Sequence, residues 1–416
     1  MSEIRVAYLA AIFPRATDTW IQRELAALRE AGVEIETFAI RRPDTSHIVG
    51  PEQQAEQDKV TYILEAAKSP KLFVSHAKLL VRSPRRYLNG LRLAWSTKRA
   101  GIKGGLYQLF YFAEAGLLAE ELKSRKVQHL HNHFGDSGCT VSMLASELSG
   151  VPFSFTLHGP GIFFEAATWR LDAKINKAAF VACISYFCRS QAAIFAEPGD
   201  VEKLHIIHCG INTETLTPVE HVGVGSEIIF VARLAELKGI SDLLRAISTL
   251  TAEHGQLRLT IIGDGPERTR FEKLADKLDL GNHVTFTGYL SQTEVADYLK
   301  RSHILVLPSY AEGVPVSLME ALASQVPVVA TQVGGVSELV EDGVNGFIVR
   351  PGDIEHLAGR LDQLLSDGSL RQTMGEAGRA TTVSEFNNTY ESLRLKTLFT
   401  NTIEGLPTPM RPELEG

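Results

Sequence analysis

The sequence predicts an α/β protein made of two Rossmann-like, doubly wound parallel sheets that face each other across a cleft. Short apolar segments alternate with helical patterns along the whole chain, and such alternation is typical of parallel sheets covered by helices on both faces. A length of 416 residues suits about two domains. Near residues 213–225, Pro218 and nearby glycines interrupt the rhythm. We therefore expect a first domain over residues 1–219 and a second over 220–384.

The elements follow in order. In the first half, a strand and a helix that ends at Gly32 open the chain, a second strand and a long basic helical region follow, and four more strands complete the sheet. These strands are expected within residues 4–13, 33–41, 127–134, 151–159, 178–185 and 203–211. In the second half, six strands each precede a helical pattern, and they are expected within residues 226–234, 257–265, 283–290, 303–309, 327–333 and 346–351. The Pro-rich end, residues 404–416, is expected to be disordered.

The composition, with 44% hydrophobic and 22% charged residues, is that of a soluble globular enzyme. No apolar run reaches the roughly 18 residues that a membrane span needs. The opening stretch has no basic region before a long apolar core, so we expect no signal peptide. The four cysteines form no CxxC pair, which suits a reducing cytoplasm.

Charge is distributed unevenly, although the net charge is only −7. Between Ala66 and Ala113 there are ten basic residues, seven large aromatic residues and no acid. Such a segment is typical of proteins that bind anionic surfaces, either lipid headgroups or nucleic acid. It can also be a solvated helical face. We expect it to bind the anionic surface of a membrane, and we expect no nucleic-acid partner.

Polar or glycine-rich turns follow five consecutive strands of the second half, and ligands of parallel sheets bind at these carboxyl ends. Arg233 and Lys238 stand at one of them and predict a site for a diphosphate, since a guanidinium and an ammonium both pair with phosphate oxygens. The helix starts after Gly313 and Gly335 offer further N–H donors. The chain contains no Asp-x-Asp pair, so we expect no metal ion.

Two glutamates flank the start of the helix in the stretch EGVPVSLME. Glu312 precedes the helix, and Glu320 lies about 12 Å further along its axis. Carboxylates accept hydrogen bonds from hydroxyl groups, so the pair suits the sugar and the ribose at the two ends of a nucleotide-sugar. A salt-bridged structural glutamate is the alternative.

Arg233-x4-Lys238-Gly239, Glu312-x7-Glu320 and Gly334-Gly335-Val-x-Glu338 resemble motifs of the retaining glycosyltransferases of family 4, which have the two-domain GT-B fold. The resemblance implies that Arg233 and Lys238 hold the donor diphosphate, that Glu312 contacts the donor sugar, and that Glu320 contacts the ribose. It places the nucleobase near Gly263, Gly265, Tyr289 and Leu290, and it adds Gly313, Val314 and Pro315 to the donor site. It also implies a terminal helix, residues 385–403, that crosses back to the first domain.

The first half resembles the family more loosely. His133 and His158 correspond to strand ends that face the donor sugar, and Gly159 follows directly. The usual glycine-rich first loop is replaced by FPRATDTWIQREL, as in a subgroup associated with exopolysaccharide and lipid-linked glycan assembly. This places Thr17, Asp18 and Thr19 near the donor phosphates and the acceptor, although Thr19 is equally suited to capping the helix. The alternation of His129, His131 and His133 can bind zinc, but no third type of ligand lies nearby in the sequence.

The sequence therefore predicts a retaining, metal-independent hexosyltransferase in which His158, Glu312, Arg233 and Lys238 are the catalytic residues. The donor is expected to be a UDP- or GDP-linked sugar, used as co-substrate without any cofactor. The expected acceptor is a lipid-linked or polysaccharide-precursor glycan, met by a cytoplasmic enzyme at the inner face of the membrane. A small soluble acceptor is one alternative, and a non-catalytic protein that binds nucleotide-sugars is another. A nucleotide-sugar epimerase would need acid and base groups on both faces of the sugar, and the Arg–Lys and paired-Glu set argues against it.

Overall fold

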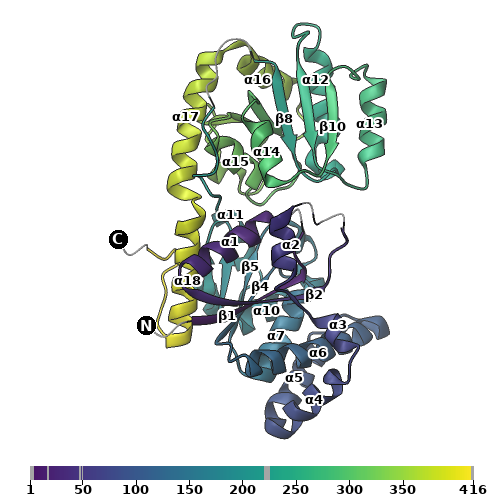
Figure 1. Cartoon of the computed structure of the whole chain (residues 1–416), viewed down its shortest axis with the longest axis vertical. Coiled ribbons are helices and arrows are strands. Elements are labelled where there is room, and N and C mark those ends of the chain that lie inside the picture. Colours follow the sequence, from purple (N-terminus) through teal and green to yellow (C-terminus); the bar gives the residue numbers. More distant parts are fainter. Residues whose placement is uncertain (1–3, 16–17, 46–47, 49, 220–224, 414–416) are drawn as a thin grey trace. The chain divides into compact units, whose positions relative to one another are not determined.

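The computed structural model describes residues 4–15, 18–45, 48, 50–219 and 225–413, and the chain divides into two compact units (Figure 1). Unit 1 comprises Met1–His208 together with Thr389–Gly416, and unit 2 comprises Cys209–Asn388. The division at Cys209 lies before the interrupted stretch that the sequence suggested as the joint. Ile211 explains the earlier division, because its N–H and C=O pair with the backbone of Phe386 and Asn388 within unit 2.

Unit 1 is built on one sheet in which all described neighbours are parallel, in the order β3-β2-β1-β4-β5-β6-β7. Its strands are β1 (Ile4–Ile12), β2 (Val33–Arg41), β3 (Thr61–Tyr62), β4 (His129–His133), β5 (Phe153–Leu157), β6 (Phe180–Cys183) and β7 (Leu204–Ile206). The central strands are buried almost throughout, which is why they read as continuous apolar runs in the sequence.

The helices of unit 1 include a group that the sequence suggested only as one basic region. The helices of unit 1 are α1 (Thr19–Glu30), α2 (Pro51–Gln57), α3 (Ile63–Ala67), α4 (Lys71–Arg82), α5 (Pro84–Ser96), α6 (Gly101–Ser124), α7 (Ser137–Ser149), α8 (Gly161–Phe164), α9 (Ala166–Trp169), α10 (Leu171–Lys177), α11 (Tyr186–Ala193) and α18 (Asn388–Glu404). The group within the basic region is α4, α5 and α6. Pro84 ends α4 and begins α5 at its first turn, where a missing N–H costs nothing.

Unit 2 repeats the same architecture with a six-stranded parallel sheet, in the order β10-β9-β8-β11-β12-β13. Its strands are β8 (Glu227–Val231), β9 (Arg258–Ile262), β10 (Val284–Gly288), β11 (Ile304–Leu307), β12 (Val328–Thr331) and β13 (Gly346–Val349). Its helices are α12 (Ile240–Leu250), α13 (Arg268–Lys277), α14 (Gln292–Leu299), α15 (Val316–Ala323), α16 (Ile354–Ser366) and α17 (Gly368–Glu385). The two parallel sheets flanked by helices confirm the predicted fold class.

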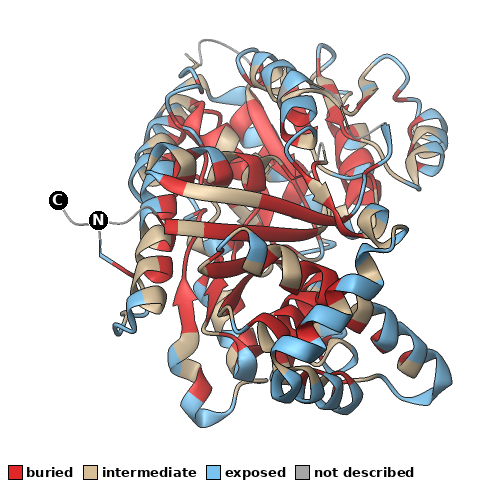
Figure 2. Ribbon diagram, turned by 60° about the horizontal axis from the view of Figure 1, so that its bottom comes forward, coloured by how far each residue is buried: buried red, intermediate tan, exposed pale blue. Residues whose placement is uncertain are grey.

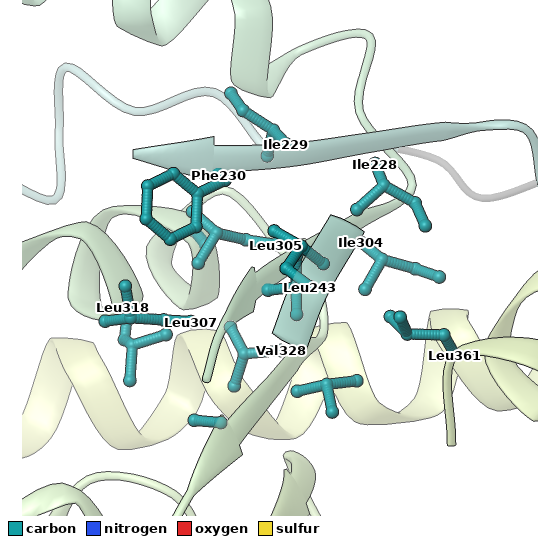
Figure 3. Close-up of a cluster of buried hydrophobic side chains, with 14 of the residues drawn as sticks. Ile228, Ile229, Phe230, Leu243, Ile304, Leu305, Leu307, Leu318, Val328 and Leu361 are labelled. Atoms are coloured by element: carbon teal, nitrogen blue, oxygen red, sulfur yellow. The ribbon is translucent and has the colours of Figure 1, made fainter. Parts of the chain in front are cut away.

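The core of unit 2 forms where the central strands meet the helices that cover them (Figure 3). Ile229 of β8 and Leu305 of β11 are fully buried, and so are Leu243 of α12 and Leu318 of α15. Burying side chains of this kind stabilises a fold by roughly 1.5–3 kcal/mol each. This core fixes the ends of β8 and β11 next to each other, because the two strands pair directly.

The last helix, α18, packs on unit 1 although it follows unit 2 in the chain. Leu395, Leu398 and Phe399 are buried in the same cluster as Tyr8 of β1 and Phe180 of β6. The ring of Phe399 also contacts His129 and His131 on β4, with centroids 5.1 and 5.4 Å apart. The helix therefore completes the hydrophobic core of unit 1.

The segment after α18 differs from the expected disordered tail, since the structure describes it as far as Glu413. The carbonyl oxygen of Met410 accepts a hydrogen bond from the N–H of Ile206 at 2.7 Å, and the carbonyl oxygen of Pro409 pairs with the His205 ring. Arg411 reaches the carboxylate of Glu391 at 2.9 Å. Proline lacks an N–H but keeps its carbonyl, so a Pro-rich strip can still cover the open edge of β7.

The outer faces of α4, α5 and α6 carry large apolar side chains in water. Figure 2 shows most strands in red, as buried, whereas pale blue gathers on the outer turns of helices. Phe73, Val81, Trp95, Ile102 and Phe110 are between 63% and 86% exposed. No helix within the described residues is long and apolar enough to cross a membrane.

Candidate active site

The loop between β8 and α12 lies against the end of β11 in unit 2, and two glycines permit this close approach. Gly239 has a φ of 71°, and a Cβ atom there would clash with the carbonyl oxygen of Pro308. Gly334, with a φ of 55°, lies equally close to the carbonyl oxygen of Glu312. Any other residue would suffer backbone strain and a steric clash, so these glycines hold three strand ends together.

This packing brings Lys238 and Glu312 into contact, although 73 residues separate them in the sequence. The Nζ of Lys238 lies 2.6 Å from Oε1 of Glu312, and the hydroxyl of Ser309 donates to the same oxygen at 2.6 Å. Glu312 is buried, whereas Lys238 is half-buried. A buried carboxylate needs such partners, because burying an unpaired charge is costly.

Arg233 stands on the same loop as Lys238 and is exposed. Within the residues that the structure describes, its guanidinium forms neither a hydrogen bond nor an ion pair with another side chain. A guanidinium with five free N–H donors is well suited to the oxygen atoms of a phosphate. The loop thus presents Lys238, which is paired with Glu312, and Arg233, whose guanidinium is available to a ligand.

The start of α15 follows directly on the loop of Glu312. Pro315 occupies the N-cap position, and the carbonyl oxygen of Gly313 accepts a hydrogen bond from the N–H of Gly335 at 2.8 Å. Val314 packs into the core. The first amides of a helix have no acceptor inside the helix, so they are available to an anion.

One expectation for this region, a helix that starts after Gly335, needs correction. The stretch after Gly335 is a three-residue 3-10 turn, Val336–Glu338, because Leu339 and Val340 turn inward to the core immediately afterwards. Glu320 lies on α15 but is half-exposed, since it stands on the edge of the helix beside the buried Met319 and Ala321. Its carboxylate therefore does not need a ligand to compensate for burial.

The loops after β9 and β10 border the loop of Arg233. The N–H of Leu234 donates to the carbonyl oxygen of Asp264 at 3.0 Å, so the stretch from Gly263 to Gly265 touches the Arg233 loop directly. Gly263 pairs with Gly288, the residue before Tyr289 and Leu290, which are both half-buried. Apart from Glu320, which lies on α15, the residues predicted for the donor side thus belong to strand ends of unit 2.

A brace between two of these loops was not predicted from the sequence. The phenol of Tyr310 donates a hydrogen bond to Asp242 on α12, and this bond, with burial and the negative charge of Asp242, raises the pKa of Tyr310 to about 12. The N–H of Tyr310 also donates to the carbonyl oxygen of Leu237 at 2.8 Å. The brace holds the Lys238 loop to the Glu312 loop from the outside.

In unit 1 the two predicted histidines lie at adjacent strand ends. His133 is the last residue of β4 and His158 directly follows β5, and Nδ1 of His133 lies 2.8 Å from Nε2 of His158. The indole of Trp20 packs on the His158 ring, with centroids 3.8 Å apart. Burial, together with the neighbouring His133, holds the pKa of His158 well below its usual range. His158 is therefore neutral at pH 7.

Glu24 extends this pair into a chain of polar groups. Its Oε1 lies 3.3 Å from Nε2 of His133 and accepts a hydrogen bond from the Tyr8 hydroxyl at 2.8 Å. The His133 Nε2 atom makes no hydrogen bond among the described residues, so its contact with Glu24 is an electrostatic one, and Nδ1 of His133 shares one proton with Nε2 of His158.

Glu24 also supplies the third type of ligand that the sequence did not show beside the histidines. The ligand atoms of Glu24, His131 and His133 lie within 4.8 Å of one another. However, both ring nitrogens of His131 already pair with the hydroxyls of Ser154 and Thr156, at 2.7 and 2.9 Å. The histidine row of β4 is thus built into a hydroxyl network, and a metal ion would have to break it.

At the other predicted position of unit 1, Asp18 rather than Thr19 occupies the N-cap of α1. The buried Asp18 carboxylate accepts two hydrogen bonds from Arg15, at 2.8 and 2.9 Å, so it is held by an ion pair instead of capping the helix. Thr19 begins the helix, and Gly159 is half-buried after His158. Thr17 lies outside the described residues.

Two family models match the chain, one over each half. Residues 221–381 match the model "Glycosyl transferases group 1", and residues 19–215 match the model "Glycosyltransferase Family 4". These ranges contain every residue named above for the donor side in unit 2, together with His133, His158 and Glu24.

Curated relatives and solved structures agree with these matches. A putative colanic acid biosynthesis glycosyltransferase, WcaL of Salmonella typhimurium, is 27% identical over 372 residues, which cover 86% of this chain and 90% of that protein. The alpha-D-kanosaminyltransferase of Streptomyces kanamyceticus is 28% identical over 69% of this chain and 78% of its own. The structure of Anabaena HepE in complex with UDP and glucose superposes with a TM-score of 0.72 at 17% identity, covering 96% of this chain and all of that one.

Proposed function

Because the chain belongs to the family 4 glycosyltransferases and has their GT-B fold, we propose that it transfers a hexose from a nucleotide-diphosphate sugar to an acceptor hydroxyl with retention of configuration. The observation that carries this proposal is the set of cations at the strand ends of unit 2. Lys238 and Arg233 share one loop, and Glu312 is 2.6 Å from Lys238. This set provides two charges for a diphosphate and one acceptor for a sugar hydroxyl.

The proposed chemistry uses charge stabilisation more than proton transfer. As the glycosidic bond breaks, negative charge develops on the leaving diphosphate, and Arg233, Lys238 and the first amides of α15 would neutralise it. Glu312 would accept a hydrogen bond from the sugar and so orient its anomeric carbon. The acceptor hydroxyl would lose its proton to the departing phosphate oxygen, on the face that the phosphate leaves, which gives retention.

His158 would contribute on the acceptor or sugar side in unit 1. Its ring is neutral and lies 2.8 Å from the ring of His133 at the end of the neighbouring strand. Glu320, at mid-helix on α15, would accept from the ribose. For the donor we propose UDP- or GDP-linked sugars; the HepE structure, which is a complex with UDP and glucose, supports the uridine form.

The acceptor is proposed to be a polysaccharide-precursor glycan, because a relative over most of the chain is named for colanic acid biosynthesis. We propose further that this glycan is lipid-linked and is met at the cytoplasmic surface of the membrane. Lys71, Arg85, Arg92 and Lys103 support this step, since they are exposed on α4–α6 beside the exposed apolar residues. Their side chains have no ion-pair partner among the described residues.

The proposed function is tested by incubating the protein with UDP-, GDP- and ADP-sugars and a polyprenyl-diphosphate-linked glycan, after exhaustive treatment with EDTA. We expect transfer from one donor class, without added metal, because Arg233 and Lys238 would supply the cations that the diphosphate needs. Proton NMR of the product reports the anomeric configuration. Loss of turnover in EDTA with recovery in Mg²⁺ or Mn²⁺ would refute metal independence, and an inverted product would refute retention. Tight binding without transfer or hydrolysis would identify a non-catalytic binding protein.

The membrane proposal is tested by sedimentation with vesicles of rising anionic-lipid content. The variant with Lys71, Arg85, Arg92 and Lys103 changed to Gln should bind at least about tenfold more weakly at low salt, since each cation near such a surface contributes on the order of 1 kcal/mol. Binding of the wild type should also weaken between 0.1 and 1 M salt, as the Debye length falls from about 10 to 3 Å.

The control variant changes the same number of exposed cations in unit 2, Lys273, Lys277, Lys300 and Arg301, to Gln. It should bind vesicles like the wild type. If both variants lose binding equally, the attraction is only a matter of net charge; if the wild type ignores anionic vesicles, a soluble acceptor becomes the better proposal.

A further inference from the structure

Unit 1 contains a cavity of about 180 Å³ that none of the predicted site residues line. It lies among the first turns of α6, the start of α7 and the segment that joins α9 to α10. Its walls combine three aromatic rings with three cations, namely Tyr107, Tyr111, Trp169, Arg99, Arg170 and Lys174. This composition is unusual for a gap left by imperfect packing, which is normally apolar.

The charges around the cavity do not cancel. Arg170 forms a bidentate ion pair with Asp172, at 2.8 and 3.0 Å. The negative charges of Asp136 and Asp172 also interact with the ammonium of Lys174. Arg99 lies over the Trp169 ring, 3.9 Å from its centroid. Its Nε donates to the carbonyl oxygen of Thr168 at 3.2 Å, while its terminal N–H groups have no partner among the described residues. Three cations and two carboxylates leave one net positive charge at the cavity.

Lys174 adds a donor inside the wall. Its side chain is completely buried, and two of its three N–H donors reach the carbonyl oxygens of Gly135 and Asp136, at 2.7 and 2.8 Å. Within the described part of the chain, the third N–H has no oxygen or nitrogen acceptor, and the ammonium lies over the Trp169 ring, 5.5 Å from its centroid. Burial lowers the pKa of Lys174 to about 8, so the ammonium is still mostly charged at pH 7. Burying a charge with one unused donor is costly unless a ligand can accept from it.

The rim of the cavity is apolar and faces water. Tyr107 lines the cavity yet is 57% exposed, and Ile102, Leu106 and Phe110 form the neighbouring stripe of α6 at a spacing of four residues. Trp95 lies on α5 just before Ser96, whose carbonyl oxygen accepts from Arg170. A cationic cavity bordered by exposed aromatic and aliphatic side chains matches a molecule with an anionic head and an apolar tail.

We propose that this cavity binds the phosphate head of a lipid-linked acceptor, with the apolar chain lying along the exposed stripe of α6. The inference deepens the proposed function and rests on it for the ligand's role as acceptor. The cavity residues would hold the lipid phosphate, while the strand-end cations of unit 2 hold the donor diphosphate.

The test is calorimetric titration of the full chain with geranyl diphosphate, inorganic diphosphate and geraniol, in excess UDP. Geranyl diphosphate should bind at least about tenfold more tightly than either of the other two, because only it has both head and tail. Arg99→Gln should weaken its binding about tenfold, which is the loss of one charge-assisted contact. Tyr107→Ala should weaken the binding of geranyl diphosphate but not that of inorganic diphosphate. Both residues are exposed, so the fold should be preserved, and circular dichroism checks this.

Lys126→Gln is the matched control, since it removes one exposed cation of the same unit that follows the far end of α6 and does not line the cavity. It should change binding less than twofold. Diphosphate bound in unit 2 is common to all variants, so the comparison among them isolates the cavity. Unchanged binding in Arg99→Gln would overturn the site. If geraniol bound as tightly as geranyl diphosphate, the cavity would not recognise an anionic head. If inorganic diphosphate bound as tightly, the apolar tail would contribute nothing to binding.

The readout is binding, so this test is separate from that of sugar transfer. Binding that depends on Arg99 in a protein that transfers no sugar would refute the proposed function and leave the cavity assigned. Sugar transfer to a lipid-linked acceptor by a protein whose lipid binding ignores Arg99 and Tyr107 would refute the cavity alone.

Discussion

Replacing Lys238 by Ala is expected to lower kcat/KM by roughly 10² to 10³, which corresponds to about 2.7–4 kcal/mol of transition-state stabilisation. Two losses contribute. The diphosphate loses one of the two cations that the strand-end loop offers, and Glu312 loses its 2.6 Å ion pair while it stays buried. A carboxylate left with only the Ser309 hydroxyl is free to reorient, so the sugar hydroxyl loses a fixed acceptor.

The Glu312→Gln variant separates these two losses. It keeps the shape and the Ser309 contact but removes the charge that pairs with Lys238. In a double-mutant cycle, the two substitutions should be strongly non-additive, since they touch the same pair. Lys300→Ala is the control: Lys300 pairs with Asp297 at 2.8 Å on the exposed surface of the same unit, and such pairs contribute about 0–1 kcal/mol. Turnover of Lys238→Ala within a few-fold of the wild type would remove the basis of the donor-site assignment.

Unit 1 is expected to lose much of its stability between pH 7.5 and pH 5. Burial lowers the pKa of His129 to about 3 and that of His208 to about 4, and it holds the pKa values of His131 and His158 well below their usual range. These groups stay neutral in the folded protein, whereas the unfolded chain takes up protons near pH 6.5. The unfolded state therefore binds more protons below pH 6.5, and stability falls as the pH falls towards 3–4.

The size of the effect follows from the same shifts. At pH 5, His129 and His208 each cost about 2 kcal/mol relative to pH 7.5, and the other two histidines add to this. Glu114 acts in the opposite direction, because burial raises its pKa to about 7, and it returns about 2 kcal/mol over the same interval. Burial also raises the pKa values of Asp136 and Glu391, which offsets part of the loss, and lowers that of His205, which adds to it. The net change is expected to be a loss of stability towards pH 5.

Urea unfolding, followed by tryptophan fluorescence at pH 7.5, 6 and 5, measures this dependence. His129→Gln should flatten it by about 2 kcal/mol at pH 5, because the amide can still pair with Ser154 but cannot be protonated. His356→Gln, the same change on α16 of unit 2, is the control and should leave the pH dependence of unit 1 as it was. A midpoint that is constant from pH 7.5 to 5 would show that the histidines are not sealed from water.

The sequence predicted the parallel sheets and the residues at the strand ends, because both depend on patterns that are local in the chain. The apolar run of β11 and the Pro315 that precedes α15 are visible without any knowledge of tertiary contacts. Glu24 was missed because it reaches His133 from α1, over a distance of more than a hundred residues in the sequence. The brace from Tyr310 to Asp242 was missed for the same reason. Ordinary residue types at ordinary helix positions carry no signal until the fold brings them together.

The remaining differences come from burial and pairing, which composition describes poorly. The Pro-rich end has the composition of a disordered segment, yet its carbonyl groups cover the edge of β7. Glu320 looks buried in a sequence of apolar neighbours, but the helix period turns it to the half-exposed edge of α15.

The return of α18 to unit 1 determines the order in which the protein can mature on the ribosome. The first 208 residues emerge early, but they lack Leu395, Leu398 and Phe399, which close the core around Tyr8 and Phe180. Unit 2 is continuous, so it can fold as soon as its last residues leave the exit tunnel. Unit 1 has to wait, with part of its apolar interior open, while the whole of unit 2 is synthesised. The nascent chain therefore exposes the apolar interior of unit 1 until α18 has been synthesised, and the packing of α18 is the step that closes this core.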